Sequence, residues 1–239
     1  MQFRGKYFKI NAVKILLAIL PFFFAALDAA AEGTHVYFAS KYLALHKEFN
    51  PEGQKAFIAG TLFPDIRYLG TVSRGKTHEK HVSSSKIANA KTPFHAGLLL
   101  HCLVDDRREA YVKKSRILHR IKGVPKKKRE SFLKLVEDEI LWEKFDLELA
   151  KDSLRIVLPE ESKRCGSEET ARRWHESLLS YFQMSPSRLF SKLAIAGEGF
   201  ANEDPNTVVK WSALIAEYAH DAEFIAYVEA MVDKVFEGL

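Results

Sequence analysis

Apolar residues recur along most of the chain at intervals of three and four, the spacing typical of helices that bury one face. This pattern covers residues 34–48, 52–61, 93–114, 126–151, 167–184 and a last long stretch that begins after Asn206 and Thr207. Thr92 before Pro93, and Ser185 before Pro186, predict helix starts, because a capping hydroxyl precedes a proline in the first turn. Ser167, with Thr170, is expected to cap the helix that ends near Met184. No strand pattern alternates with these helices, so the sequence predicts an all-α, single-domain, multi-helix bundle.

Polar, turn-forming segments separate the expected helices. Residues 67–92 are predicted to be rich in loops, and Pro159–Gly166 is predicted to be a linker. Phe63 precedes Pro64 and is therefore biased away from helical backbone angles, which predicts a corner at Phe63-Pro64-Asp65.

The N-terminal segment differs from the rest of the chain. Basic residues precede the unbroken apolar run Ile15–Leu27, and Ala29-Ala30-Ala31 follows it. A basic start, a short apolar stretch and small residues at the end are typical of a secretory signal peptide. We therefore expect residues 1–31 to be removed after Ala31, leaving residues 32–239 as one domain that is secreted or periplasmic. The alternative is an uncleaved N-terminal anchor, although the run is shorter than the roughly 20 residues that span a bilayer.

Composition and charge exclude few functions. Of 239 residues, 47% are hydrophobic and 28% are charged, which is ordinary for a globular protein. The formal net charge of +5 is too small to indicate a stable nucleic-acid partner. The basic segment Arg120–Arg129 is most simply a solvated loop, and contact with an anionic membrane surface is the alternative. Cys102 lies in an apolar run, which favours a buried free thiol over a disulfide with Cys165.

Well-known catalytic motifs are missing. The chain has no GxGxxG, GxxxxGK[ST] or GxSxG sequence. His78-Glu79-Lys80-His81 is one residue too short for the zinc-protease motif, in which two histidines four positions apart share a helical face. A peptidase is therefore a poor interpretation.

The pair His101 and Asp105 is the first candidate for chemistry. The two residues are four positions apart in a segment with a strong helical pattern, so their side chains leave the same face one turn apart. Such a pair can bind a divalent cation, although a simple hydrogen-bonded pair is the alternative. Gly97, one turn earlier, is expected to leave room for a partner or a metal on that face. His95 is rotated away from His101 and is expected to face elsewhere.

The order of several short motifs resembles a known family. The motifs are Gly33-Thr34-His35, Gly60-x-x-x-Pro64-Asp65, Thr77-His78 and Phe94-x-x-Gly97-x-x-x-His101-x-x-x-Asp105. Together they resemble the zinc-dependent phospholipase C family, which includes bacterial phosphatidylcholine phospholipases and the catalytic domain of clostridial alpha-toxins. The resemblance covers roughly residues 33–110 and implies an all-α bundle with zinc ions in a cleft.

The resemblance also implies roles for individual residues. Asp65, His78, His101 and Asp105 would bind one zinc ion, and Asp105 would bridge to a second ion bound by His35. Asp65 would also orient the attacking water and is the candidate catalytic residue.

A third ion is bound in that family by two histidines and a glutamate, which this chain does not match. Glu139 and Glu143, one turn apart, are the nearest substitutes, with a solvated acidic face as the alternative. The resemblance therefore implies one to three zinc ions. We expect the donor atoms of the ligands sharing one ion to lie roughly 3–4 Å apart, and Glu139 or Glu143 to point into the same cleft.

The activity implied by the resemblance is that of an exported zinc-dependent phosphodiesterase. It would hydrolyse phospholipid headgroup esters by metal-activated water, which leaves diacylglycerol. Two alternatives remain open at this stage. Fungal single-strand nucleases are similar to the family in fold and metal cluster, so the substrate could be a nucleotide or another phosphoester. The chain could also be a non-enzymatic helical binding protein.

Overall fold

The computed structural model describes residues 32–70, 72–197 and 204–239, and within them the chain is all-helical, without strands. The expected signal peptide lies outside the described residues. The helices are α2 (Glu32–Leu45), α3 (Pro51–Leu62), η2 (Phe63–Leu69), α4 (Arg74–Thr77), α5 (Ser84–Ala88), α6 (Pro93–Ser115), η3 (Ile117–His119), η4 (Lys126–Lys128), α7 (Arg129–Leu141), η5 (Trp142–Lys144), α8 (Leu147–Ser153), α9 (Pro159–Cys165), α10 (Glu168–Tyr181), α11 (Pro186–Ile195), α12 (Pro205–Ala219) and α13 (Ala222–Phe236), where η marks short 3-10 segments. The prediction of an all-α fold is confirmed.

Several predicted helix starts are also confirmed. The Thr92 hydroxyl accepts a hydrogen bond from the His95 amide at the start of α6. The Ser167 hydroxyl accepts one from the Thr170 amide at the start of α10. Both caps satisfy amides that have no acceptor inside the first turn of a helix.

Other boundaries were predicted wrongly. The pattern over residues 126–151 suggested one helix, but the backbone is extended at Phe145, and Asp146 caps α8 by accepting from the Leu149 amide. Pro159–Gly166 is not a linker, because residues up to Cys165 form α9. The C-terminal stretch is two helices rather than one, since Asp221 caps α13. The cap of α12 is Asp204 rather than Asn206 or Thr207. Residues 67–92 contain the short helices α4 and α5.

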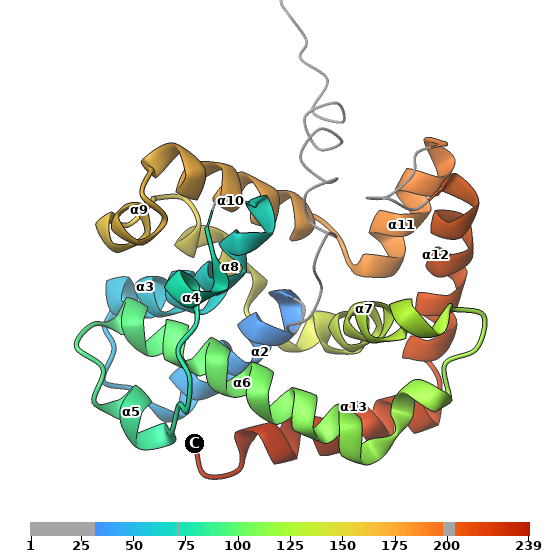
Figure 1. Ribbon diagram of the computed structural model, residues 1–239, viewed down its shortest axis with the longest axis horizontal. Helices are drawn as coiled ribbons and strands as arrows, with labels where there is room; N and C mark the ends of the chain where they lie inside the picture. The colour runs from blue at the N-terminus through green and yellow to red at the C-terminus, as the bar shows by residue number, and fades with distance from the viewer. Residues whose placement is uncertain (1–31, 71, 198–203) are drawn as a thin grey trace, which may run out of the picture.

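Helix α6 runs through the middle of the molecule, with α2 and α3 on one side and α13 alongside it (Figure 1). Helices α3 and α6 cross very closely at two glycines. A Cβ atom added to Gly97 would lie 2.0 Å from the carbonyl oxygen of Phe57, and one added to Gly60 would lie 1.9 Å from that of Phe94. Only glycine permits this approach, which brings the end of α3 against the middle of α6.

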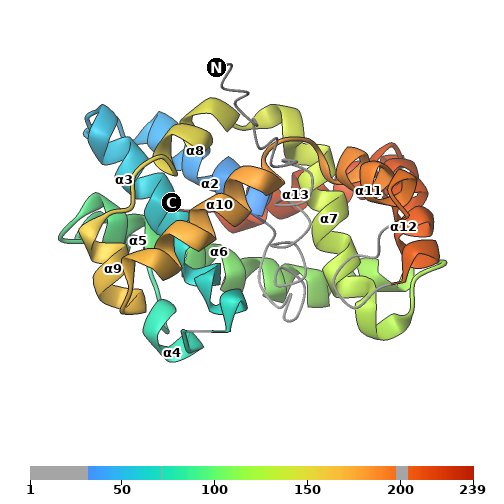
Figure 2. The same cartoon turned by 90° about the horizontal axis from the view of Figure 1, so that it is seen from above.

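Helix α7 packs against α2, and α10 crosses in front of α2 and α6 in the view from above (Figure 2). Trp174 of α10 is buried, and its indole N–H donates to the carbonyl oxygen of Leu62 at the end of α3. Apolar side chains from nearly all of the helices form one continuous core around this contact. None of the described helices is long and apolar enough to cross a membrane.

Candidate metal centre

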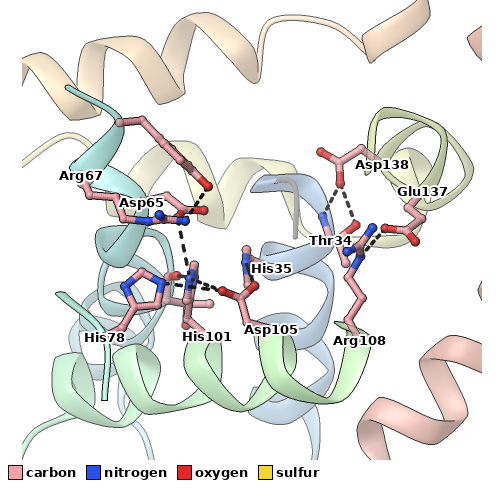
Figure 3. A network of polar contacts seen from close by, with 12 residues as sticks. Thr34, His35, Asp65, Arg67, His78, His101, Asp105, Arg108, Glu137 and Asp138 are labelled. Atoms are coloured by element: carbon pink, nitrogen blue, oxygen red, sulfur yellow. Dashed lines mark hydrogen bonds and ion pairs between the residues drawn. The ribbon is translucent and has the colours of Figure 1, made fainter. Parts of the chain in front are cut away.

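Five side chains that are far apart in the sequence meet beside α6 (Figure 3). His35 comes from the first turn of α2, Asp65 from η2, and His78 from the residue that follows α4. His101 and Asp105 come from α6 and lie one turn apart. The structure therefore brings together all five residues that the motifs had indicated between Gly33 and Asp105.

The Asp105 carboxylate is the common neighbour of the three histidines. Its oxygens lie 3.5 Å from His35 Nε2, 3.6 Å from His78 Nε2 and 3.4 Å from His101 Nε2. His101 Nε2 is also 3.9 Å from an oxygen of Asp65. These separations match those between ligand atoms that share one ion, because metal–ligand bonds of about 2.0–2.2 Å place the donor atoms roughly 3–4 Å apart.

Two overlapping groups of donor atoms could each hold a metal ion. One group is His35, His101 and Asp105, and the other is Asp65, His78 and His101. Within each group, one donor atom from every residue lies within 4.8 Å of the others. The two groups share His101, so the donors are arranged as a single centre with room for one ion or for two neighbouring ions.

Helix α3 sets the orientation of His101. The Nδ1 atom of His101 lies 2.9 Å from the carbonyl oxygen of Thr61. Since a carbonyl only accepts, Nδ1 carries the proton and Nε2 keeps its lone pair, directed at Asp65 and Asp105. The close crossing at Gly60 and Gly97 makes this contact. The space expected beside Gly97 is therefore filled by the backbone of α3 and is not open to a metal.

Thr77 fixes His78 in the same way. The Thr77 hydroxyl lies 2.8 Å from His78 Nδ1 and 3.3 Å from the carbonyl oxygen of Arg74. If the hydroxyl donates to that carbonyl, it accepts from Nδ1–H, which again leaves the Nε2 lone pair facing the centre. Metal-binding histidines are usually held by such a contact to their second nitrogen.

His35 is held by packing. Its ring stacks on that of His101 with 3.8 Å between centroids and an interplanar angle of 15°. It is completely buried, and neither ring nitrogen has a hydrogen-bond partner among the described residues.

Several polar atoms of the centre are buried without a hydrogen bond from the described part of the chain. They are both ring nitrogens of His35, Nε2 of His78, Nε2 of His101 and Oδ2 of Asp65. Burying polar atoms without partners is costly, and several at one place are typical of a site that binds a positive ligand. Nitrogen and oxygen lone pairs that converge in this way fit a divalent cation.

The pKa values of His35 and His78 agree with this interpretation. Burial, assisted by the neighbouring His101, lowers the pKa of His35 to about 4, and burial also lowers the pKa of His78. Both rings are therefore neutral at pH 7 and can act as ligands. Burial opposes a charge on His101 too, but the carboxylates of Asp105 and Asp65 outweigh it and raise the pKa of His101.

Asp65 lies in η2 and is positioned by two later residues of the same segment. Its Oδ1 atom lies 3.3 Å from Arg67 Nε, and Arg67 also donates to the Tyr68 hydroxyl. The carboxylate is buried, and the same Oδ1 atom faces His101, while Oδ2 has no hydrogen bond from the described residues.

Helix α7 supplies further buried charges that sequence patterns did not reveal. Asp138 accepts hydrogen bonds from the amides of Gly33 and Thr34, from the Thr34 hydroxyl and from the Tyr181 hydroxyl. It thereby fixes the start of α2, one residue before His35. Burial raises the pKa of Asp138 to about 6 despite these donors. The signal available in the sequence was the presence of charged residues inside the apolar run Phe132–Leu141.

Glu139 and Glu143 are not brought to the centre. The Glu139 carboxylate accepts from the hydroxyls of Ser185 and Ser187 and from the Ser187 amide, at the start of α11. Glu143 lies in η5 and is exposed. His95 also faces elsewhere, and its Nε2 atom is 2.7 Å from Glu79.

A pocket of about 510 Å³ lies beside His78, which is the residue of the centre that lines it. It is lined by Arg74, His78, Lys80, His81, Cys102 and Asp106, among others. The Arg74 guanidinium is half-exposed and lies 4.0 Å from the Asp105 carboxylate, so it connects the pocket with the centre. Cys102 and Cys165 are both free, as expected for Cys102.

Comparisons of the chain with protein-family models, with curated proteins and with solved structures gave no match. The functional proposal therefore rests on the residues themselves.

Proposed function

We propose that this protein is an exported zinc-dependent phosphodiesterase that hydrolyses phospholipid headgroup esters. The single observation that supports it is the convergence of His35, Asp65, His78, His101 and Asp105 on one buried place, where polar atoms of the first four residues have no hydrogen bond from the described residues. The order and spacing of these residues supply the link to phospholipase C chemistry.

The donor set favours zinc among the common divalent cations. Imidazole nitrogens and carboxylate oxygens are typical zinc ligands, whereas calcium and magnesium prefer sites made of oxygen alone. His35 and His78 are neutral at pH 7, as metal ligands must be. His101 and Asp65 face each other across the space that an ion would occupy.

Zinc bound here would supply Lewis acidity that activates water near neutral pH and neutralises charge on a phosphoryl group. The protein residues supply orientation. The Oδ1 atom of Asp65 contacts Arg67 and faces His101, while its Oδ2 atom is buried without a hydrogen bond from the described residues, so this carboxylate could orient the attacking water. The buried walls of α2, η2 and α6 exclude bulk water from this reaction.

A phospholipid substrate agrees with two features outside the centre. The expected signal peptide indicates export, and the basic segment Arg120–Arg129 offers positive charge for an anionic membrane surface. The pocket beside His78 would admit a headgroup and not the acyl chains. Nucleotides and other phosphoesters are the alternative substrates that the experiment must separate.

The first experiment measures metal content by mass spectrometry on protein purified without chelator. We expect zinc in the wild type and its loss in His101→Ala. The matched control is His95→Ala, which changes a histidine on the same helix that contacts Glu79 instead. Equal losses in both variants would show that the wrong ligand has been assigned.

The second experiment measures hydrolysis by the zinc-loaded protein. The panel consists of phosphatidylcholine vesicles, a dinucleotide and a soluble aryl phosphodiester. We expect phosphocholine release that strong chelators abolish and zinc restores. Turnover of the dinucleotide with no release from vesicles would instead favour a nuclease, and zinc binding without any hydrolysis would favour a binding protein.

A further inference from the structure

The pocket beside His78 has a positively charged side chain next to the metal centre that the proposed reaction does not yet use. Arg74, the first residue of α4, lines this pocket of about 510 Å³ together with His78. The Nη2 atom of Arg74 lies 4.0 Å from Oδ2 of Asp105, the carboxylate that neighbours all three histidines of the centre. The guanidinium is therefore close to the donors of the centre and open to the pocket.

One turn of backbone holds Arg74 and His78 together. The His78 amide donates to the carbonyl oxygen of Arg74 at 2.9 Å. The Thr77 hydroxyl, which lies 2.8 Å from His78 Nδ1, is 3.3 Å from the same carbonyl oxygen. Because this turn also fixes the ring of His78, the backbone of Arg74 has a fixed place relative to the centre.

The guanidinium of Arg74 is not committed to a partner within the described residues. Its half-exposed side chain makes no hydrogen bond there, and its 4.0 Å separation from Asp105 exceeds the roughly 2.7–2.9 Å of a charge-assisted hydrogen bond. Arg67, the other arginine near the centre, differs, because it donates to Asp65 and to the Tyr68 hydroxyl. The N–H donors of Arg74 are therefore available to a ligand in the pocket.

The formal charges of the pocket lining also favour an anion at Arg74. Glu79 lines the pocket, but its carboxylate is paired with Lys86 Nζ at 2.6 Å. Histidines aside, the other charged residues of the lining are Lys80 and Asp106, whose opposite charges offset each other. Arg74 therefore gives the lining a net positive charge on the side of the centre.

We propose that Arg74 binds non-bridging oxygens of the phosphate group in the substrate, at the place where the pocket meets His78 and Asp105. The inference rests on the proposed function and identifies the side from which the phosphodiester enters the centre. A guanidinium presents paired N–H donors that match two phosphate oxygens, and it keeps its charge at every physiological pH. The residues of the centre direct lone pairs at an ion, so the hydrogen-bond donors for the phosphate oxygens come from Arg74.

The test measures binding of inorganic phosphate to the whole protein by calorimetry, in the zinc-loaded form without free zinc and in the metal-free form. We expect phosphate to bind the zinc-loaded wild type. Arg74→Met should weaken this binding about tenfold or more, since hydrogen bonds between charged groups are among the strongest in proteins. Arg74→Lys keeps the charge and loses the paired donors, so its phosphate affinity should lie between those of the other two proteins.

Zinc affinity separates this role from a structural one. Arg74→Met removes a positive charge beside Asp105, so it should bind zinc at least as tightly as the wild type. An arginine that only held Asp105 in place would lower the zinc affinity when replaced, and that result would overturn the proposal.

The matched control is Arg116→Met. Arg116 follows the end of α6 and lines a second pocket, of about 560 Å³, together with His119 and Arg120. This pocket is the other place on the described surface where basic side chains would attract phosphate. Phosphate affinity that falls in Arg116→Met and not in Arg74→Met contradicts the proposal, and so does a wild type that binds no phosphate.

Failure of the proposed function is distinguishable from failure of this site. It appears as missing zinc or missing hydrolysis, whereas the site is judged by phosphate affinity. If the protein holds no zinc, the metal-free titration decides instead. Weaker phosphate binding by Arg74→Met than by the wild type would then support the site, and equal binding or none would overturn it.

Discussion

The Nδ1 atom of His101 contacts the carbonyl oxygen of Thr61 at 2.9 Å, across the close crossing of α3 and α6 at Gly60 and Gly97. This contact joins the metal centre to the packing of the fold. Gly60 and Gly97 let α3 and α6 approach, the approach brings the Thr61 carbonyl to His101, and the carbonyl fixes which ring nitrogen faces Asp65 and Asp105. The glycines of the sequence motif therefore act through geometry rather than through contact with a metal.

Replacing Gly97 by alanine should damage both stability and metal binding. The added Cβ atom would lie 2.0 Å from the carbonyl oxygen of Phe57, and a backbone atom in a packed helix cannot move aside cheaply. We expect the free energy of unfolding to fall by about 3 kcal/mol, the upper range for overpacking a core, with weaker zinc binding in the protein that still folds. Urea denaturation and zinc titration measure the two effects.

Gly75→Ala is the matched control for this change. Gly75 lies in the short helix α4, and a Cβ atom there would meet nothing within 4 Å. The free energy of unfolding of Gly75→Ala should rise by less than about 1 kcal/mol, because alanine is a better helix former than glycine. Similar behaviour of the two variants would contradict the role assigned to the crossing.

Replacing Thr77 by valine should weaken zinc binding while the fold is retained. The valine leaves His78 Nδ1 without the hydroxyl that now orients it, so the ring is free to present the wrong nitrogen. Loss of such a supporting contact typically reduces metal affinity about tenfold or more. Competition with a zinc chelator measures the affinity. In the control Thr207→Val, the lost hydroxyl is an exposed one that donates to Asp204, the cap of α12. The zinc affinity of this control should be unchanged.

The parts of this molecule that follow local rules could be predicted from the sequence. The four-residue spacing of His101 and Asp105 placed both on one face of α6, and Thr92 and Ser167 cap the helices that they were expected to cap. His35, Asp65 and His78 could not be placed by spacing alone, because their meeting depends on how α2, η2 and α6 pack. Only the order of the motifs indicated that they lie together.

The parts set by tertiary packing could not be predicted. A hydrophobic pattern continues across Phe145, yet the chain turns there, because Asp146 caps a new helix. Lys134 and Asp138 of α7 are both buried, since α2 and α12 pack against this helix. A charged residue within an apolar run is the one local sign of such burial.

Glu139→Gln tests whether the acidic pair on α7 and η5 has any part in metal binding. The Glu139 carboxylate accepts three hydrogen bonds from Ser185 and Ser187 at the start of α11, as a capping group would. We expect a loss of about 1 kcal/mol in stability and an unchanged zinc content, because the carboxylate serves α11 and not the centre. Asp105→Asn, prepared in parallel, should lose the metal. Loss of zinc from Glu139→Gln as well would reinstate the glutamate as a ligand.

The stability of the metal-free protein in phosphate-free buffer should reveal the charge on Lys134 through its dependence on pH. The pKa of Lys134 is lowered to about 8 in the folded protein, from an ordinary value of 10.5, by burial and by Arg108. Below pH 8 the folded protein holds a buried ammonium that the unfolded chain solvates, so the full cost of about 3 kcal/mol is present. Between pH 8 and 10.5 the folded protein loses this proton before the unfolded chain does, and the cost disappears.

Lys134→Met removes the group and should therefore be more stable than the wild type by up to about 3 kcal/mol at pH 7, with a difference that shrinks as the pH approaches 10. Urea denaturation at the two pH values measures it, and the difference between the two proteins cancels the titration of all other groups. Lys127→Met, an exposed lysine, should match the wild type at both pH values within about 0.5 kcal/mol. A Lys134→Met protein that is less stable than the wild type at pH 7 would mean that the ammonium already has a partner inside the folded chain.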